Sequence, residues 1–159
     1  MNNVFLLLGS NLGDRKLFLQ QAIRHIEYDI APIIKISSVY ETQSWGKSDE
    51  PDYLNLVIEL QTDLSAQTIL EKILAIEDVM GRKRAEKWGS RIIDIDILYY
   101  NAAIIDEPGL QIPHPELHKR RFTLEPLAEI APDLIHPVLH KNSLQLKKAL
   151  KDNLIVKKL

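Results

Sequence analysis

Residues 92–98, Ile-Ile-Asp-Ile-Asp-Ile-Leu, constrain the fold of this chain more than any other stretch. Isoleucine is β-branched and favours strands, and a Gly-Ser pair just before the stretch interrupts any preceding element. Side chains alternate between the two faces of a strand, so the isoleucines at odd positions and Tyr99 should share one apolar face. Asp94 and Asp96 should share the other face. The sequence therefore predicts a strand that buries one face and carries two carboxylates on the opposite one.

The paired carboxylates follow a dense block of positive charge. Aspartates two residues apart on a strand lie about 7 Å apart at the backbone, so they can converge on one hard cation or on two neighbouring metal ions. Two interpretations fit these residues. The carboxylates hold Mg²⁺ while the cations bind polyphosphate oxygens, or a solvated basic loop lies beside a polar sheet face. The cations of the block are Arg82, Lys83, Arg84, Lys87 and Arg91, with Glu86 as the one acid among them.

Size and composition indicate an ordinary globular protein. A chain of 159 residues predicts a single domain spanning residues 1–159. The net charge of −2 argues against general affinity for nucleic acids or membranes, so we expect neither as a partner. The absence of cysteine excludes disulfides and thiolate metal sites and fits a cytoplasmic location. The apolar run at residues 4–8 is too short for a signal peptide, and no segment has the length of a membrane span.

The order of predicted elements favours a ferredoxin-like fold. Apolar periodicity predicts strand, helix, strand, strand, helix and strand, followed by a proline-rich segment with short helices and a mobile tail. This is the split β-α-β arrangement, an α+β class in which helices pack on one face of an antiparallel sheet. Long active-site loops and the aspartate-bearing strand would then build a site on the other face. The expected strands are residues 4–8, 33–42 and 53–61 and the strand that carries Asp94. The expected helices are one around residues 19–26, one from Ser65 to Gly81, and two at residues 123–130 and 144–150.

Three loops present candidate site residues. The Gly9-Ser10-Asn11 loop can bind a ligand or simply turn the chain. The polar loop around Trp45 joins two strands, and its tryptophan either contacts a ligand or folds back onto the core. The elbow at residues 112–115 presents His114, which is a ligand-binding group or a structural histidine.

The chain resembles the 6-hydroxymethyl-7,8-dihydropterin pyrophosphokinase family of folate synthesis. The resemblance rests on Lys-x-Gly-Ser-Arg-x-x-Asp-Ile-Asp-Ile-Leu at residues 87–98 and on Gly-Ser-Asn-Leu-Gly at residues 9–13, and it extends to Phe122. By this resemblance the pterin site consists of Thr42, Trp45, Tyr53, Asn55 and Phe122. The nucleotide and metal site consists of Arg82, Arg84, Trp88, Arg91, Asp94, Asp96, His114 and Arg120.

The resemblance implies transfer of diphosphate from ATP to the pterin hydroxymethyl group, with release of AMP. Asp94 and Asp96 would hold two Mg²⁺ ions, Arg82 and Arg91 would act in catalysis, and Arg84, Trp88, His114 and Arg120 would bind the nucleotide. Tyr53 and Phe122 would sandwich the flat pterin ring while Asn55 reads its polar edge. The family also implies a monomer whose partners are its two small-molecule substrates.

Two other classes of protein fit parts of the pattern. A metal-dependent glycosyltransferase uses Asp-x-Asp to hold a nucleotide sugar, but this chain is short and lacks a βαβα pattern. A ferredoxin-like regulatory or RNA-binding module shares the fold, but the aromatic motifs of RNA-binding strands are absent from the sequence. A requirement for Mg²⁺ in ATP binding separates the enzyme from such modules.

Overall fold

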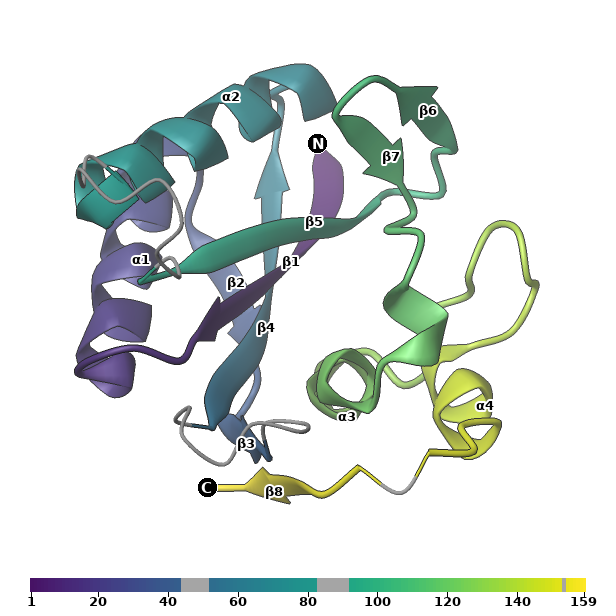
Figure 1. The fold of residues 1–159 in the computed structure, drawn as a ribbon. Helices are drawn as coiled ribbons and strands as arrows, with labels where there is room; N and C mark the ends of the chain where they lie inside the picture. Colours follow the sequence, from purple (N-terminus) through teal and green to yellow (C-terminus); the bar gives the residue numbers. More distant parts are fainter. Residues whose placement is uncertain (44–51, 83–91, 153) are drawn as a thin grey trace.

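The computed structural model describes residues 1–43, 52–82, 92–152 and 154–159. Within these ranges no helix has the length and apolar character needed to cross a membrane. The elements, in chain order, are β1 (Asn2–Ser10), α1 (Arg15–Asp29), β2 (Ile33–Ile36), β3 (Tyr40–Thr42), β4 (Tyr53–Thr62), α2 (Ala66–Glu77), η1 (Asp78–Arg82), β5 (Asp94–Tyr100), β6 (Ile105–Glu107), β7 (Leu110–Ile112), η2 (Leu117–Lys119), α3 (Arg121–Ile130), α4 (Ser143–Lys148) and β8 (Val156–Lys158) (Figure 1).

One antiparallel sheet organises these elements. Its strands lie in the order β5-β1-β4-β3-β8, β2 pairs with β4 beside β3, and β6 and β7 form a separate hairpin. The central strands are β1 and β4, which pair along their whole lengths from Asn2 opposite Thr62 to Ser10 opposite Leu54. From β1 to β5 the order is β-α-β-β-β-α-β, in which β2 and β3 together replace one expected strand. This order confirms the α+β class, and the antiparallel sheet matches the expected ferredoxin-like arrangement.

Helices α1 and α2 cover one face of the sheet. Their apolar stripes meet alternate residues of β1, β4 and β5 in one core cluster, which includes Leu19, Ile26, Ile69 and Ile73. Both helices begin at side-chain caps: Asp14 accepts a hydrogen bond from Leu17 N at 3.2 Å, and Ser65 Oγ accepts one from Thr68 N at 3.1 Å. Capping satisfies backbone donors that a helix start leaves without partners. The sequence predicted both helices, the second of them beginning at Ser65.

The opposite face is partly covered as well, which the expected one-sided packing did not include. Leu124 and Leu127 of α3 and Leu146 of α4 form a second core cluster with Phe5, Leu7 and other residues of the sheet. Figure 1 shows α3 and α4 on the other side of the sheet from α1 and α2. The expectation of helices on one face therefore holds for α1 and α2, while the proline-rich C-terminal part supplies a second layer.

A β-bulge in β5 corrects the predicted strand faces. The pairing with β1 shifts between Phe5, which is opposite Tyr99, and Leu6, which is opposite Ile97. Leu98 is the extra residue, and an extra residue reverses the alternation beyond it. Tyr99 consequently belongs to the second cluster with Leu98, instead of sharing the face of Ile97. The prediction was wrong for Tyr99 because the sequence alone contains no signal for the bulge.

The strand predicted at residues 33–42 is divided into β2 and β3. Between them, Ser37 Oγ accepts a hydrogen bond from Val57 N at 2.9 Å, so a side chain takes the place of a strand partner. Ser38 N donates to the carboxylate of Glu129, at 3.1 and 3.2 Å from its two oxygens. These side-chain contacts compete with the regular backbone ladder and end β2.

The last residues of the chain form a strand, contrary to the prediction of a mobile tail. Val156, Lys157 and Lys158 pair with Thr42, Glu41 and Tyr40 and form β8. Gln43 N also donates to Ile155 O at 3.3 Å, and Leu159 N donates to Val39 O at 2.9 Å. The short basic segment lacks the apolar alternation on which strand prediction depends, and its strand forms because β3 offers an open edge.

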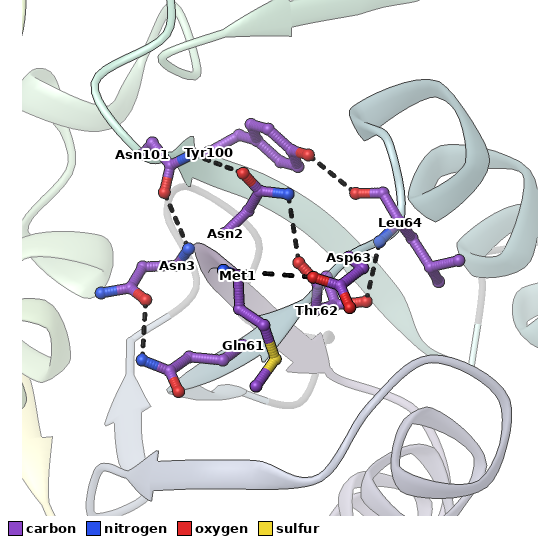
Figure 2. A network of polar contacts seen from close by, with 9 residues as sticks. All are labelled: Met1, Asn2, Asn3, Gln61, Thr62, Asp63, Leu64, Tyr100 and Asn101. Atoms are coloured by element: carbon purple, nitrogen blue, oxygen red, sulfur yellow. Dashed lines mark hydrogen bonds and ion pairs between the residues drawn. The ribbon is translucent and has the colours of Figure 1, made fainter.

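A polar network fastens β1, β4 and β5 at the end where β1 begins (Figure 2). Asn2 Nδ2 donates to Thr62 O at 3.1 Å, and Asn101 Nδ2 donates to Asn2 Oδ1 at 2.8 Å. Tyr100 OH donates to Leu64 O at 2.7 Å, which ties β5 to the turn before α2. Asp94 and Gly9 lie at the opposite end of their strands, about 20 Å away along the sheet.

Acid pH should destabilise the fold because it protonates His136, which is buried beside the second core cluster. His136 is buried against Tyr99, with ring centroids 5.9 Å apart, and its Nδ1 accepts hydrogen bonds from the backbone amides of Val138 and Leu139. Burial, reinforced by the charges of His118 and His140, lowers the pKa of His136 below its ordinary value of 6.5. As the pH decreases, this histidine is therefore protonated more readily in the unfolded chain than in the folded protein. The free energy of unfolding should consequently fall as the pH decreases below about 6.5.

Thermal unfolding between pH 7.5 and 5 measures this effect. His136→Asn offers a side-chain oxygen to the same backbone amides but does not titrate, so its unfolding temperature should depend less steeply on pH. Equal slopes for the wild type and the variant would assign the acid sensitivity to other groups.

Candidate functional site

Three neighbouring strands align residues of the candidate site in one row. Asp94 of β5 is opposite Gly9 of β1, and Gly9 is opposite Asn55 of β4. Residues directly opposite each other in antiparallel strands point to the same face. The carboxylate and the amide therefore lie on one face, two strand spacings or about 10 Å apart at the backbone.

Gly9 keeps the middle of this row open. A Cβ added to Gly9 would lie 2.6 Å from Asn55 Nδ2, which is closer than atoms can approach without displacement. The Asn55 side chain instead reaches over Gly9 and donates from Nδ2 to Leu8 O at 3.3 Å. The observed conformation of the Asn55 side chain therefore requires a glycine at position 9. Gly9 and Ser10 are the last residues of β1, so the prediction of a loop beginning at Gly9 was wrong and the segment does more than turn the chain.

Two side chains hold the aspartate-bearing end of β5. Ser10 Oγ donates to Ile92 O at 2.6 Å. The buried carboxylate of Glu77, at the end of α2, accepts a hydrogen bond from Ile95 N at 3.0 Å, between the two aspartates. Asp94 and Asp96 are partly exposed on the face that these contacts fix. Both carboxylates thus lie on a firmly held strand.

Buried polar atoms collect on β3 and β4 next to the row. Thr42 is opposite Tyr53, and Tyr40 is opposite Asn55, so all four side chains share the face of Asn55. Thr42 and Asn55 are more than nine-tenths buried. Among the residues that the structure describes, neither Thr42 Oγ1 nor Asn55 Oδ1 has a hydrogen-bond partner. Unsatisfied buried polar groups are costly, so these atoms indicate the binding of a polar ligand.

Charged and aromatic groups of the C-terminal part approach the same face. The Arg120 guanidinium carbon lies 5.5 Å from the centroid of the Phe122 ring, which packs partly buried at the start of α3. The charges of Asp96 and Arg120 both act on His114, so these three residues are neighbours. The structure therefore gathers Asp96, His114, Arg120 and Phe122, which the sequence separates by up to 26 residues.

His114 is held as a neutral donor. Burial lowers its pKa; the nearby Asp96 charge opposes this effect and the Arg120 charge adds to it. Its Nδ1 accepts a hydrogen bond from Glu116 N at 3.1 Å, which places the proton of the neutral ring on Nε2. The backbone is fixed by a hydrogen bond from His114 N to Leu98 O at 3.1 Å. The imidazole can therefore donate one hydrogen bond to a ligand from Nε2.

A hollow of ≈ 430 Å³ lies along the outer edge of β5, within the size range of small-molecule sites. β5 is an edge strand of the sheet, and the hairpin of β6 and β7 faces its free side. The hollow is therefore lined mostly by apolar residues and also reaches one of the two aspartates, Asp96. Its lining residues are Leu70, Ile95, Asp96, Ile97, Gly109, Leu110, Gln111, His114 and Pro115.

Part of the predicted site falls outside the described residues. Arg84, Trp88 and Arg91 of the basic block and Trp45 with its loop lie there, and the Arg82 side chain is not described either. Their predicted roles, and the long active-site loops, therefore stay predictions.

Sequence reasoning missed the hydrophobic lining of the hollow and the role of Gly9. Leu70 of α2 and the hairpin bearing Leu110 and Gln111 line the hollow, and the sequence predicts no site role for either. The only available signal was the Gly109 turn between two short apolar segments, which does not reveal that the hairpin folds against β5.

Comparison with known proteins identifies the family. The model of the 7,8-dihydro-6-hydroxymethylpterin-pyrophosphokinase (HPPK) family matches residues 5–132. The chain belongs to the HPPK family. It is 45% identical over 141 residues to 2-amino-4-hydroxy-6-hydroxymethyldihydropteridine pyrophosphokinase of Aquifex aeolicus, covering 89% of this chain and 88% of that protein. It is 42% identical to the protein of the same name from Bacillus subtilis, over 82% of this chain and 79% of that one.

Solved structures support the HPPK fold. A Plasmodium falciparum HPPK-DHPS structure superposes with a TM-score of 0.76 over 92% of this chain, at 19% sequence identity. At this identity the likeness shows the fold alone. This chain spans 44% of that protein, which carries a second part named DHPS.

Proposed function

We propose that this HPPK-family chain transfers the diphosphate group of ATP to 6-hydroxymethyl-7,8-dihydropterin and releases AMP. The observation that carries the proposal is the row of Asp94, Gly9 and Asn55 on one face of the sheet. This row supports the proposal because its carboxylate and its amide lie about 10 Å apart at the backbone, which leaves room for the reacting groups of a metal–nucleotide complex and a pterin.

The pterin half of the site uses the buried polar atoms. Asn55 Oδ1 accepts from a pterin N–H, and Thr42 Oγ1 donates to or accepts from the ring edge. The ring is stacked between Tyr53 and Phe122, which is a favourable arrangement for a flat bicyclic molecule. Trp45 contributes from the adjoining loop. The pterin satisfies groups whose burial is otherwise unfavourable.

The nucleotide half uses the hollow beside β5. Adenine fits between the apolar side chains of Leu70 and Leu110, and the free edge of β5 presents backbone groups to its polar rim. His114 donates from Nε2 and Arg120 binds phosphate or ribose oxygens. Arg84 and Trp88 are predicted to complete the nucleotide contacts.

Asp94 and Asp96 fit the requirements of Mg²⁺. They offer carboxylate oxygens on one face, and no group of three or more potential metal-binding side chains gathers anywhere in the described part of the chain. Mg²⁺ is commonly bound by one or two carboxylates together with substrate phosphates, so an all-protein cage is unnecessary. We propose two Mg²⁺ ions, whose chemistry is neutralisation of polyphosphate charge and lowering of the pKa of the attacking hydroxyl.

The reaction requires positioning more than covalent chemistry by the protein. The pterin hydroxymethyl oxygen forms a bond to the β-phosphorus, and the bond between that phosphorus and the α,β-bridging oxygen breaks. AMP leaves with the bridging oxygen, and the hydroxyl proton is released to solvent water. Arg82 and Arg91 are predicted to neutralise charge that builds on the phosphate oxygens. Orientation and charge stabilisation of this kind account for most catalysis of phosphoryl transfer.

The proposal takes residues 1–159 as one domain that acts as a cytoplasmic monomer. One sheet supports both core clusters, which is consistent with a single domain. The cytoplasm supplies ATP and Mg²⁺ to such an enzyme.

Product analysis tests the proposed function. The protein is incubated with Mg²⁺, ATP and 6-hydroxymethyl-7,8-dihydropterin, and the nucleotides are separated. We expect AMP and pterin diphosphate in equal amounts, and neither product when the pterin or Mg²⁺ is omitted. ADP as the nucleotide product would instead indicate transfer of a single phosphoryl group, and the absence of turnover would contradict the proposal.

A further inference from the structure

A surface carboxylate of α3 organises the strand that carries Thr42. Glu129 Oε1 accepts a hydrogen bond from Tyr40 OH at 2.7 Å. The same carboxylate accepts from Ser38 N at 3.1 and 3.2 Å and from Ser38 Oγ at 2.9 Å. Burial would raise the pKa of Glu129, but these hydrogen bonds and the charge of Lys158 bring it below the ordinary value. Glu129 is therefore a charged acceptor at neutral pH and joins α3 to β3.

Tyr40 transmits this contact toward the pterin half. Its buried side chain lies directly opposite Asn55, on the face that Asn55 shares. Side chains opposite each other in an antiparallel pair approach closely, so the Tyr40 ring limits where the Asn55 amide can lie. The other restraint on that amide is its hydrogen bond to Leu8 O above Gly9.

The same helix carries Phe122 at its first turn. Phe122 and Glu129 are seven residues apart, which puts them on one face of α3 about 10 Å apart along its axis. α3 contacts both β3 and β4. The Glu129 contact therefore sets the position of α3, and of Phe122, relative to the strands that carry Thr42 and Asn55.

The C-terminal strand β8 holds the other side of this arrangement. It pairs with β3, and its Lys158 is opposite Tyr40 and near the Glu129 carboxylate. β8 lies beyond residues 5–132, the part of the chain that the HPPK family model matches. β3 is thus fixed along one edge by β4 and along the other by β8, and Glu129 of α3 holds it on the face that carries Tyr40.

We propose that Glu129, acting through Tyr40 and assisted by β8, is a positioning residue for the pterin half of the site. The inference rests on the proposed function for the identity of the ligand. Glu129 fixes the Thr42 and Asn55 polar atoms relative to Phe122 before the pterin binds. Its removal should lower pterin affinity much more than ATP affinity, because no residue of α3 lines the nucleotide hollow and only Arg120, directly before α3, is assigned to the nucleotide.

Variants of Glu129 and Tyr40 test the proposal against a matched control. Glu129→Ala and Tyr40→Phe should raise the equilibrium dissociation constant of the pterin about fivefold or more, with a much smaller change in the ATP constant. Glu129→Gln, which retains one acceptor oxygen, should recover part of the loss. The control is Glu125→Gln on the same helix, whose carboxylate instead forms ion pairs with Lys147 at 2.7 Å and Arg121 at 3.7 Å. It should leave pterin binding unchanged.

A chain that ends at Asp152 tests the contribution of β8. This truncation keeps the Arg121–Asp152 ion pair at 2.9 Å and removes the pairing with β3. We expect weaker pterin binding with retained ATP binding in the folded protein. Unchanged pterin affinity in both the truncation and Glu129→Ala would overturn the proposal and leave these contacts a role in stability alone.

Equilibrium binding separates this inference from the proposed function. If the wild type binds the pterin but forms no AMP, the proposed reaction fails while the Glu129 variants still test the positioning role. If the wild type binds no pterin, both proposals are contradicted. Equal losses for the pterin and ATP in Glu129→Ala would show general damage to the fold and contradict the positioning role.

Discussion

Replacing Asp96 by alanine should reduce turnover at least about a thousandfold, and Asp94→Ala should do the same. Each change removes an oxygen ligand from the face on which the polyphosphate is to be neutralised. Both side chains are partly exposed, so neither loss opens a cavity in the core. The single-turnover rate of AMP formation at saturating ATP and pterin measures the effect.

Asp133→Ala is the matched control for this prediction. Asp133 is an exposed carboxylate between α3 and α4, away from the row of Asp94, Gly9 and Asn55 and from the hollow beside β5. The control should keep wild-type turnover, and all three variants should unfold near the wild-type temperature. Turnover near the wild-type rate in both Asp94→Ala and Asp96→Ala would remove the basis for the metal assignment.

Gly9→Ala should weaken pterin binding at least about tenfold while ATP binding is retained. The new methyl group would lie 2.6 Å from Asn55 Nδ2, so the amide has to leave its place above Leu8 O. When the amide moves, Asn55 Oδ1 is no longer in position to accept a hydrogen bond from the pterin. Titration of pterin and ATP separately against the variant measures the two affinities.

A double-variant cycle isolates the steric origin of this effect. In an Asn55→Ala background the clash partner is absent, so adding Gly9→Ala should cost little further pterin affinity. Independent, additive losses would show that Gly9 affects the site by another route, such as strain in β1.

The sequence predicted the regular part of the fold because apolar periodicity determines it. Residues such as Leu19, Ile26, Ile69 and Ile73 recur at helical spacing and meet in one cluster. The bulge at Leu98 could not be predicted, since one extra residue between paired strands leaves no mark in the alternation. β8 could not be predicted for a related reason. Its pairing depends on the edge of β3, which is distant in sequence.

The candidate site was predictable where its residues form motifs. Asp94 and Asp96 share a face by the alternation of a strand, and the structure places them there. The alignment of Asp94 with Asn55 through Gly9 depends on the register of three strands, which a single sequence does not reveal. The hollow beside β5 likewise depends on how the hairpin of β6 and β7 folds back.

The measurement that tests the account most directly follows radioactive phosphorus from ATP to the products. Two parallel reactions use ATP labelled at the α- or at the β-phosphorus, each with Mg²⁺ and 6-hydroxymethyl-7,8-dihydropterin. The account predicts that the β label appears in the pterin product and the α label in AMP. An α label in the pterin product would show nucleotidyl transfer, and a β label that remains in ADP would show transfer of the γ-phosphoryl group; either result would contradict diphosphate transfer.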